Sequence, residues 1–268
     1  MPNETAHPHE TAIARLIAIM ARLRDPDEGC AWDLQQTHET IVPYTIEEAY
    51  EVAEAVKSGN PDELKDELGD LLLQVVFQAR IAEEANTFDF EAVAEAISTK
   101  MVRRHPHIFG ETTYRNRPEQ REAWEAIKAE ERKEKNKSGI LDGVATTLPP
   151  VMRAVKLQKR AGRVGFDWPD PAPVMAKIRE ELDEVETELA EGTDNKSGLE
   201  GEIGDLLFAV INLARKTGID PDVALTRTNE KFINRFNSIE EKAKSINQRM
   251  EDLSLNQMEE WWQQAKQR

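Results

Sequence analysis

The chain has 268 residues and a formal net charge of −16, from 51 acidic and 35 basic residues. Such an acidic surface disfavours duplex nucleic acid as the main partner, because a phosphate backbone binds basic surfaces. A nucleotide that arrives with a metal ion remains compatible, since the ion supplies positive charge. With 39% hydrophobic and 32% charged residues, the composition favours amphipathic helices over a β-sandwich.

The sequence also bears on the cellular compartment. Cys30 is the single cysteine, so an intramolecular disulfide is impossible, which fits a reducing compartment. The first residues, MPNETAHPHE, have neither the basic nor the apolar region of a signal peptide, and no uncharged run approaches the length of a membrane span. We therefore expect a cytoplasmic protein that binds neither nucleic acid nor a membrane.

The predicted elements are helices along nearly the whole chain. Asn60 and Asp220 each precede a proline and an acidic residue, which is the pattern of a helix N-cap. HPH at 105–107 is interpreted as a turn that ends a helix. These signals predict an all-α fold with helices over residues 10–24, 45–57, 61–85, 89–103, 118–135, 150–162, 171–191, 198–217, 221–249 and 256–267.

The chain contains an internal repeat. Ile46–Arg80 and Arg179–Arg215 both read E-E-x-x-E, a polar turn with glycine, E-x-G-D-L-L and an apolar helix that ends Ala-Arg. Upstream, GCAWD at 29–33 is similar to GFDWPD at 165–170. The period is much longer than in solenoid repeats, so it indicates a duplicated domain. We predict two tandem helical bundles, residues 1–115 and 150–268, with a charged connecting helix and linker over 116–149.

Acidic residues recur in both copies at helical spacing. Glu181 and Glu184 share one helix face, and Glu202 and Asp205 share a face of the next helix. A short loop makes these helices antiparallel neighbours, so we expect the four carboxylates to converge around a divalent cation. Oxygen donors without His or Cys favour Mg²⁺ or Mn²⁺ over Zn²⁺. A single acidic helix face is usually just solvated, but two copies of the whole pattern favour the metal site.

Basic residues follow the acids. Asn229, Lys231 and Arg235 lie in TRTNEKFINRF, and Lys100 and Arg104 occupy the positions of Lys231 and Arg235 in the first copy. Lys suits a phosphate as a point charge, and Arg binds one with two hydrogen bonds. On the sequence alone, Lys231 and Arg235 could be ordinary surface residues. If they lie beside a magnesium cluster, a phosphate-binding role is at least as well supported.

Aromatic residues near the C-terminus leave alternatives open. Phe232 and Phe236 occupy the adjacent helical stripe and are predicted to belong to the core. Trp261 and Trp262 can either stack on a base or anchor the terminal helix to the core. E-x-x-H spacing occurs once, from Glu4 to His7, whereas a di-iron bundle needs it on two helices, and no Walker loop is present.

Together these motifs closely resemble the MazG family of nucleoside triphosphate pyrophosphohydrolases. The resemblance covers nearly the whole chain and includes RRHPHIFGE, the AWEAIKAEER helix and the closing MEEWWQQAK. It implies an all-α fold, a tight homodimer and Mg²⁺-dependent hydrolysis of nucleoside triphosphates to nucleoside monophosphate and pyrophosphate. It also implies house-cleaning of nucleotide pools and a catalytically competent C-terminal domain.

The resemblance implies roles for individual residues. The catalytic magnesium ligands would be Glu181, Glu184, Glu202 and Asp205. The nucleotide contacts would be Lys177, Glu180, Asn229, Lys231, Arg235 and Trp262, with Lys128 of the connecting helix reaching the same site. The N-terminal acids that could also bind metal are Glu48, Glu51, Glu67 and Asp70.

The sequence departs from the family pattern at several positions. Gly198 and Gly201 replace the Lys and Glu that other members carry in the second-half loop, and Lys196 is the candidate substitute. In the first copy, Tyr44 and Ser98 stand where the second copy has Lys177 and Asn229, which predicts poorer nucleotide handling there.

Two alternative functions remain open at this point. One is a pyrophosphatase of the same fold with narrow specificity, such as a dUTPase or a dCTPase. The other is a non-enzymatic helical protein whose acidic faces bind a basic partner without metal. Stabilisation by a nucleotide only in the presence of Mg²⁺ would favour the enzymes.

Overall fold

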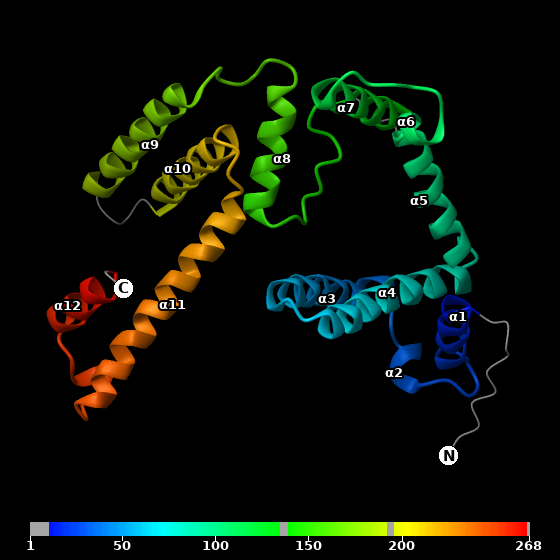
Figure 1. Ribbon diagram of the computed structural model, residues 1–268, viewed down its shortest axis with the longest axis horizontal. Coiled ribbons are helices and arrows are strands. Elements are labelled where there is room, and N and C mark those ends of the chain that lie inside the picture. The colour runs from blue at the N-terminus through cyan, green and yellow to red at the C-terminus, as the bar shows by residue number, and fades with distance from the viewer. Residues whose placement is uncertain (1–10, 135–138, 192–195, 267–268) are drawn as a thin grey trace. The chain divides into compact units, whose positions relative to one another are not determined.

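The computed structural model of the chain describes residues 11–134, 139–191 and 196–266. Within these ranges it contains helices and no strand, which confirms the all-α class (Figure 1). The chain forms two compact units, Met1–Lys128 and Ala129–Arg268. Their boundary falls inside α7 (Arg117–Glu134), in the segment for which the sequence predicts a connection.

Two long helices joined by a tight turn form the centre of the N-terminal unit. α3 (His38–Ser58) and α4 (Pro61–Glu84) pack along their lengths. Gly59 between them has a φ of 73°, in the left-handed region that glycine tolerates. The Asn60 side chain accepts a hydrogen bond from the backbone N–H of Asp62 at 3.0 Å, which confirms the predicted cap. The turn therefore places the acidic faces of both helices side by side.

Shorter helices complete this unit. They are α1 (Ala12–Leu23), α2 (Ala31–Leu34), α5 (Phe90–Arg104), α6 (Pro106–Phe109) and the first part of α7. α1 packs on α4, and the buried core consists of Met20, Ile41, Val76 and Phe77. Burial of these side chains from α1, α3 and α4 fixes the pair of helices that bears the acids.

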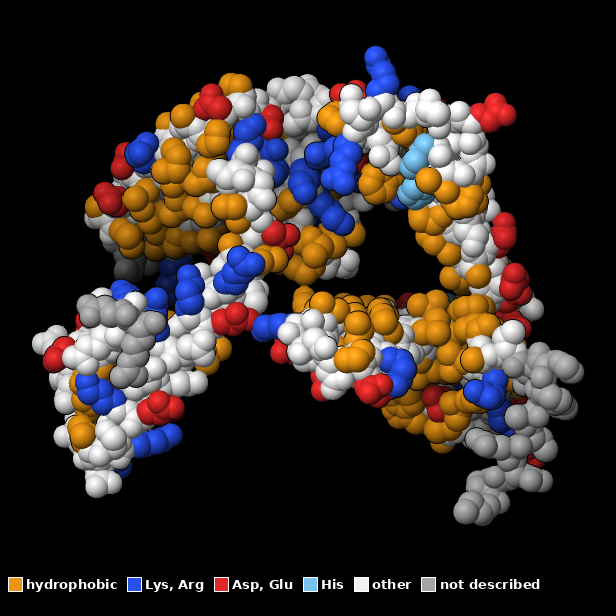
Figure 2. Space-filling view, in the orientation of Figure 1, with side chains coloured by type: hydrophobic (Ala, Val, Ile, Leu, Met, Phe, Trp, Pro, Cys, Tyr) orange, Lys and Arg blue, Asp and Glu red, His pale blue; other side chains and the backbone are white. Residues whose placement is uncertain are grey.

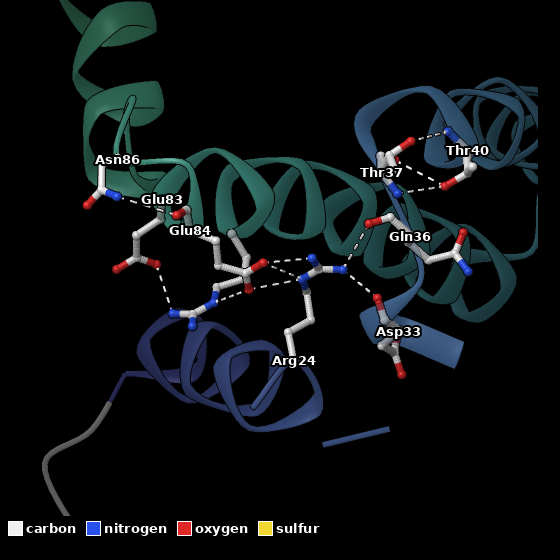
Figure 3. Close-up of polar contacts among 9 residues, drawn as sticks. Arg24, Asp33, Gln36, Thr37, Thr40, Glu83, Glu84 and Asn86 are labelled. Carbon is white, nitrogen blue, oxygen red and sulfur yellow. Dashed lines mark hydrogen bonds and ion pairs between the residues drawn. The ribbon is translucent and has the colours of Figure 1, made fainter. Parts of the chain in front are cut away.

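A buried arginine joins the ends of this core (Figure 3). Arg24 is 6% exposed; its Nη2 donates to Glu84 Oε2 at 2.6 Å, and its Nη1 donates to the backbone carbonyls of Asp33 and Gln36. Arg80 Nε donates to the same Glu84 carboxylate at 2.9 Å. These bonds, that of Arg24 first, lower the pKa of Glu84. Arg24 thereby holds the segment before α3 against the end of α4.

The main differences from the sequence-based prediction are two helix boundaries and the two short helices α2 and α6. α3 begins at His38 rather than near residue 45, because Thr37 and Thr40 form a capping box. The helix then passes through Pro43, which removes one backbone donor. Pro106–Phe109 forms a short helix where only a turn was expected. The helix predicted over 221–249 ends at Ser245, because Asn247 adopts a φ of 54°.

The C-terminal unit has the same kind of helical pair at its centre. α9 (Pro171–Glu191) and α10 (Lys196–Lys216) pack along their lengths, and α8 (Pro150–Gly162) packs against α10. α11 (Pro221–Ser245) begins after Asp220, whose side chain accepts hydrogen bonds from two backbone N–H groups, as predicted for a cap. A 3-10 turn, Met250–Asp252, then leads into α12 (Leu255–Ala265), which folds back onto α11 (Figure 1).

The end of α11 and α12 enclose a separate small core. It consists of Ile239, Ala243, Leu253 and Trp261. Trp261 is therefore the anchor of the terminal helix, one of the two roles left open for it. No helix in the described part of the chain combines the length and the hydropathy that a membrane span requires.

Candidate metal and nucleotide site

Three acids of the C-terminal unit converge where α9 packs on α10. Glu181 and Glu184 lie one turn apart on α9, Glu202 lies on α10, and one carboxylate oxygen from each lies within 4.8 Å of the others. Glu181 is buried, at 4% exposure, whereas Glu184 is exposed. Hard oxygen donors thus gather at one place that is partly shielded from water.

The charges in this cluster repel one another and attract a nearby ammonium group. The pKa of Glu184 is raised, first by partial loss of hydration and then by the charge of Glu181. Lys177 Nζ lies 2.8 Å from a Glu180 oxygen and 2.7 Å from a Glu181 oxygen, and these bonds raise the pKa of Lys177. Lys177 and Glu180 therefore adjoin the acids, and their roles as nucleotide contacts remain predictions.

Asp205, the fourth acid expected in the cluster, is not part of this group of three. It lies one turn beyond Glu202 on α10, so its side chain contributes to the wall of an adjoining cavity. Lys177 and Glu181 also line that cavity. Asp205 consequently lines the cavity together with one acid of the cluster.

The N-terminal unit gathers acids in the same way. Oxygens of Glu48 on α3 and of Glu67 and Asp70 on α4 lie within 4.8 Å of one another. Burial raises the pKa of Glu48, and the hydrogen bond that its protonated carboxyl donates to Glu51 and the charge of Asp70 raise it further. Glu51 thus contacts Glu48 but lies outside the group of three.

The two clusters differ in their surroundings. Tyr44 replaces Lys177 in the first copy, so the acids there lack the ammonium group that the second copy places beside Glu181. The carboxylates of the first copy repel one another. The pKa of Glu67 is raised by partial desolvation and then by the negative charge of Glu51. Each copy therefore brings together three of its four expected acids, a different one being left out.

A cavity of about 800 Å³ opens beside the C-terminal cluster. The segment before α8, α8, the loop before α9, α9 and α10 form its walls. Its lining comprises Leu141, Leu157, Gln158, Ala161, Gly165, Phe166, Asp167, Trp168, Val174, Lys177, Glu181, Asp205, Phe208, Ala209, Asn212 and Arg215. A concave, largely apolar space with a few fixed polar groups is typical of small-ligand sites.

The polar groups of this cavity are held in place. Gln158 Nε2 donates to the Phe208 carbonyl at 2.8 Å, which leaves Oε1 buried and without a partner among the described residues. Arg215 Nη2 donates to Asp167 at 2.6 Å and to Asn212 Oδ1 at 2.7 Å. The loop with Asp167 is thereby tied to α10.

Sequence reasoning missed most of the cavity. Gln158 lies on a helix with no distinguishing motif, and Asn212 lies on the repeated helix α10 but outside its acidic motif. Only the similarity between GCAWD and GFDWPD drew attention to the loop that carries Asp167 and Trp168. The segment of Gly198 and Gly201, interpreted as a loop, belongs instead to the first turns of α10, which begins at Lys196.

The basic residues predicted to bind nucleotide lie on α11. Asn229 and Lys231 are exposed, and neither lines the cavity. The Arg235 guanidinium lies over the Trp262 ring, 5.5 Å from its centre, which brings two of the predicted contacts together. Among the described residues, these groups are separate from the acid cluster.

The prediction that Phe232 and Phe236 belong to the core is wrong. They are 56% and 37% exposed, and their rings stack at a centroid distance of 6.1 Å. The buried core that α11 shares with α12 begins at Ile239 on α11, so both phenylalanines lie outside it. Phe232 also contacts the Trp262 ring at 5.2 Å, which makes a continuous aromatic face with Arg235.

Lys128 makes local contacts within the N-terminal unit. Its Nζ lies 3.4 Å from Glu125 and 4.4 Å from the centre of the Trp124 ring. Its role as a nucleotide contact therefore remains a prediction.

Comparison with known proteins identifies the family of the chain. A model of the MazG nucleotide pyrophosphohydrolase domain matches the chain twice, at residues 36–109 and 170–239. The nucleoside triphosphate pyrophosphohydrolase of Escherichia coli K12 is 48% identical over 95% of this chain and 97% of its own. The nucleoside triphosphate pyrophosphohydrolase/pyrophosphatase MazG of Thermotoga maritima is 44% identical over 94% of each chain.

A third relative, also described as a nucleoside triphosphate pyrophosphohydrolase, matches a shorter part of the chain. The nucleoside triphosphate pyrophosphohydrolase of Mycolicibacterium smegmatis is 41% identical over 56% of this chain and 46% of its own. The two domain matches contain the two acid clusters, one in each. The chain belongs to the MazG family of nucleotide pyrophosphohydrolases, with two tandem copies of its domain.

Proposed function

We propose that the chain hydrolyses nucleoside triphosphates to nucleoside monophosphate and pyrophosphate in its C-terminal unit. The metal would be Mg²⁺, or Mn²⁺, held by Glu181, Glu184, Glu202 and Asp205. The convergence of three carboxylate oxygens within 4.8 Å carries this proposal. The donors are all hard oxygens, and the pKa of Glu184 is raised first by partial desolvation and then by the charge of Glu181, so the cluster fits a small dication.

The residues of the chain perform the remaining tasks. When bound, the metal supplies positive charge and polarises phosphate oxygens. A carboxylate of the cluster accepts a hydrogen bond from the attacking water and takes its proton as the new phosphorus–oxygen bond forms. The bond between that phosphorus and the bridging oxygen breaks. Lys231 and Arg235 neutralise the charge on the pyrophosphate that leaves.

The adjoining cavity accommodates the nucleoside. Its volume of about 800 Å³ falls within the range of small-ligand pockets. Gln158 Nε2 is committed to a backbone carbonyl, so Oε1 is the atom that remains for a donor on the ligand. Trp168 and Phe208 provide flat apolar surface for a base.

We also propose a homodimer. Hydrophobic side chains gather over α9 and α10 in Figure 2, and Leu182, Leu189, Ile203, Leu207 and Val210 are all exposed there. Monomeric soluble proteins rarely expose large continuous apolar patches. A second copy that covers this face would also allow α11 to approach an acid cluster. House-cleaning of nucleotide pools in the cytoplasm is the role we propose for this assembly.

A panel of NTPs and dNTPs tests the activity. Incubation with Mg²⁺ should yield nucleoside monophosphate and pyrophosphate, separated by ion-exchange chromatography. Glu181→Gln should abolish turnover in a folded protein, whereas Glu186→Gln, an exposed change on the same helix, should not. Wild-type turnover in Glu181→Gln would refute the ligand assignment, and no product with any nucleotide would favour a non-enzymatic protein.

Light scattering tests the dimer. Leu207→Asp places a charge in the exposed α10 face and should yield monomers. Leu255→Asp, at an exposed leucine on α12, should leave the mass unchanged. A wild-type protein that is monomeric at micromolar concentration would contradict the proposal.

A further inference from the structure

A second cavity lies in the N-terminal unit, where α5 ends and α7 passes. It has a volume of about 360 Å³, and Arg104, Arg117 and Arg121 line it. Aromatic rings of Tyr114 and Trp124 complete the wall. No member of the acid cluster on α3 and α4 contributes to this lining, so the cavity is chemically distinct from the metal site.

The charge of this cavity is opposite to that of the chain as a whole. Arg117 and Arg121 lie four residues apart on one face of α7 and have no carboxylate partner among the described residues. Like charges at this spacing repel each other. Glu125, the acid in the lining, lies 3.4 Å from Lys128. Convergent guanidinium groups of this kind suit an anion with several oxygens, such as a phosphate.

The histidines of the RRHPHIFGE motif add a second feature. His107 Nε2 lies 3.0 Å from the amide nitrogen of Gln120, which donates to it, so the proton of the neutral ring resides on Nδ1. That Nδ1 is buried and has no partner among the described residues. A buried donor without an acceptor requires an explanation, and a ligand oxygen in this cavity provides one.

The rings offer a surface for a base. His105 lies 6.3 Å from the Trp124 ring, and His107 lies 5.3 Å from Tyr114. Trp124 is 41% exposed, so part of its face is open to a ligand. Stacking on such a ring is favourable for any base.

The internal repeat points to the same ligand class. Arg104 stands where Arg235 stands in the second copy. In the C-terminal unit the Arg235 guanidinium lies over the ring of Trp262, and in the N-terminal unit Arg104 and Trp124 line one cavity. Both copies therefore bring an arginine of one helix together with a tryptophan of a later helix.

We propose that this cavity is a second nucleotide site, which binds without metal and without hydrolysis. The phosphates contact Arg104, Arg117 and Arg121, and the base stacks on Trp124. Because the cavity contains no carboxylate cluster, the bound nucleotide is not a substrate there. This site goes beyond the proposed hydrolase function and does not depend on it.

Calorimetric titration of the full chain with ATP in EDTA tests the site, because chelation removes the metal that the C-terminal unit requires. We expect binding in the wild type and a loss of about tenfold or more in affinity for Arg117→Gln and for Arg121→Gln, since a hydrogen bond to a charged group contributes ~1.5–3 kcal/mol. Arg115→Gln is the matched control: Arg115 is exposed, lies outside the cavity and should bind like the wild type. Absence of ATP binding in EDTA, or equal affinities in all three variants, overturns the proposal.

Titrations of two further variants identify the ligand and distinguish this cavity from the proposed catalytic site. Trp124→Leu should weaken binding of ATP but not of inorganic tripolyphosphate; an equal effect on both would refute the base-stacking part. Lys231→Gln should leave ATP binding in EDTA unchanged while it impairs hydrolysis with Mg²⁺. If Lys231→Gln abolishes the EDTA binding instead, the nucleotide is bound by the C-terminal unit and the proposal fails.

Discussion

The ion pair between Asp167 and Arg215 should hold the wall of the nucleoside cavity in place. Asp167 is 20% exposed and Arg215 is 12% exposed, and Lys216 also lies within 3.3 Å of the Asp167 carboxylate. Asp167→Asn keeps the shape and one acceptor but removes the charge. Each hydrogen bond between charged groups is worth ~1.5–3 kcal/mol, so the loss of about one such bond lowers the local stability by ~2 kcal/mol.

Hydrogen exchange measures this local stability. Amides of the loop around Asp167 and of the end of α10 should exchange about 30-fold faster in Asp167→Asn, since each factor of ten corresponds to ~1.4 kcal/mol. Asp252→Asn is the control, because Asp252 pairs with Arg249 at a largely exposed position and such pairs contribute little. If the amides of this loop exchange at the same rate in Asp167→Asn and Asp252→Asn, the ion pair does not hold the loop in place.

The same ion pair predicts the direction of a pH effect. Arg215 lowers the pKa of Asp167 in the folded state below its unfolded value. The stabilisation is therefore present above the unfolded pKa, near ~3.9 for aspartate, and is lost as the pH falls through the folded pKa. Wild type and Asp167→Asn should converge in exchange rate at acid pH, and a constant difference down to that range would contradict the argument.

Three further changes have defined outcomes. Glu84→Gln leaves the buried Arg24 without its carboxylate and should lower the free energy of unfolding of the N-terminal unit by ~2 kcal/mol in denaturant titrations; an unchanged midpoint would contradict this. Glu202→Gln should abolish the additional rise in melting temperature that Mg²⁺ produces over ATP in EDTA, whereas the exposed Glu200→Gln should retain it. Trp261→Ala should destabilise the C-terminal unit by ~3–5 kcal/mol, seen by circular dichroism, because Trp261 is buried in the core; a smaller loss would exclude the anchoring role.

Local sequence signals anticipated most helices and the pairing of acids. Asn60 and Asp220 act as caps, and the helices that follow them begin at the expected prolines. The signals failed where a competing local feature was overlooked, as at Thr37, whose capping box starts α3 before Pro43. They also failed for Phe232, because helical periodicity shows which residues share a face but not whether another element covers that face.

The sequence by itself determined the all-α class and the duplication of the domain. It also determined that each pair of acids shares one helix face, because residues three or four apart lie on the same face of a helix. Only the tertiary structure decided which acids meet, that Asp205 joins a cavity wall instead, and that Gln158, Asp167 and Asn212 surround that cavity. It alone also placed three arginines around a second cavity. Such groupings join residues from different helices, and their distances depend on how the helices pack, which no local pattern in the chain encodes.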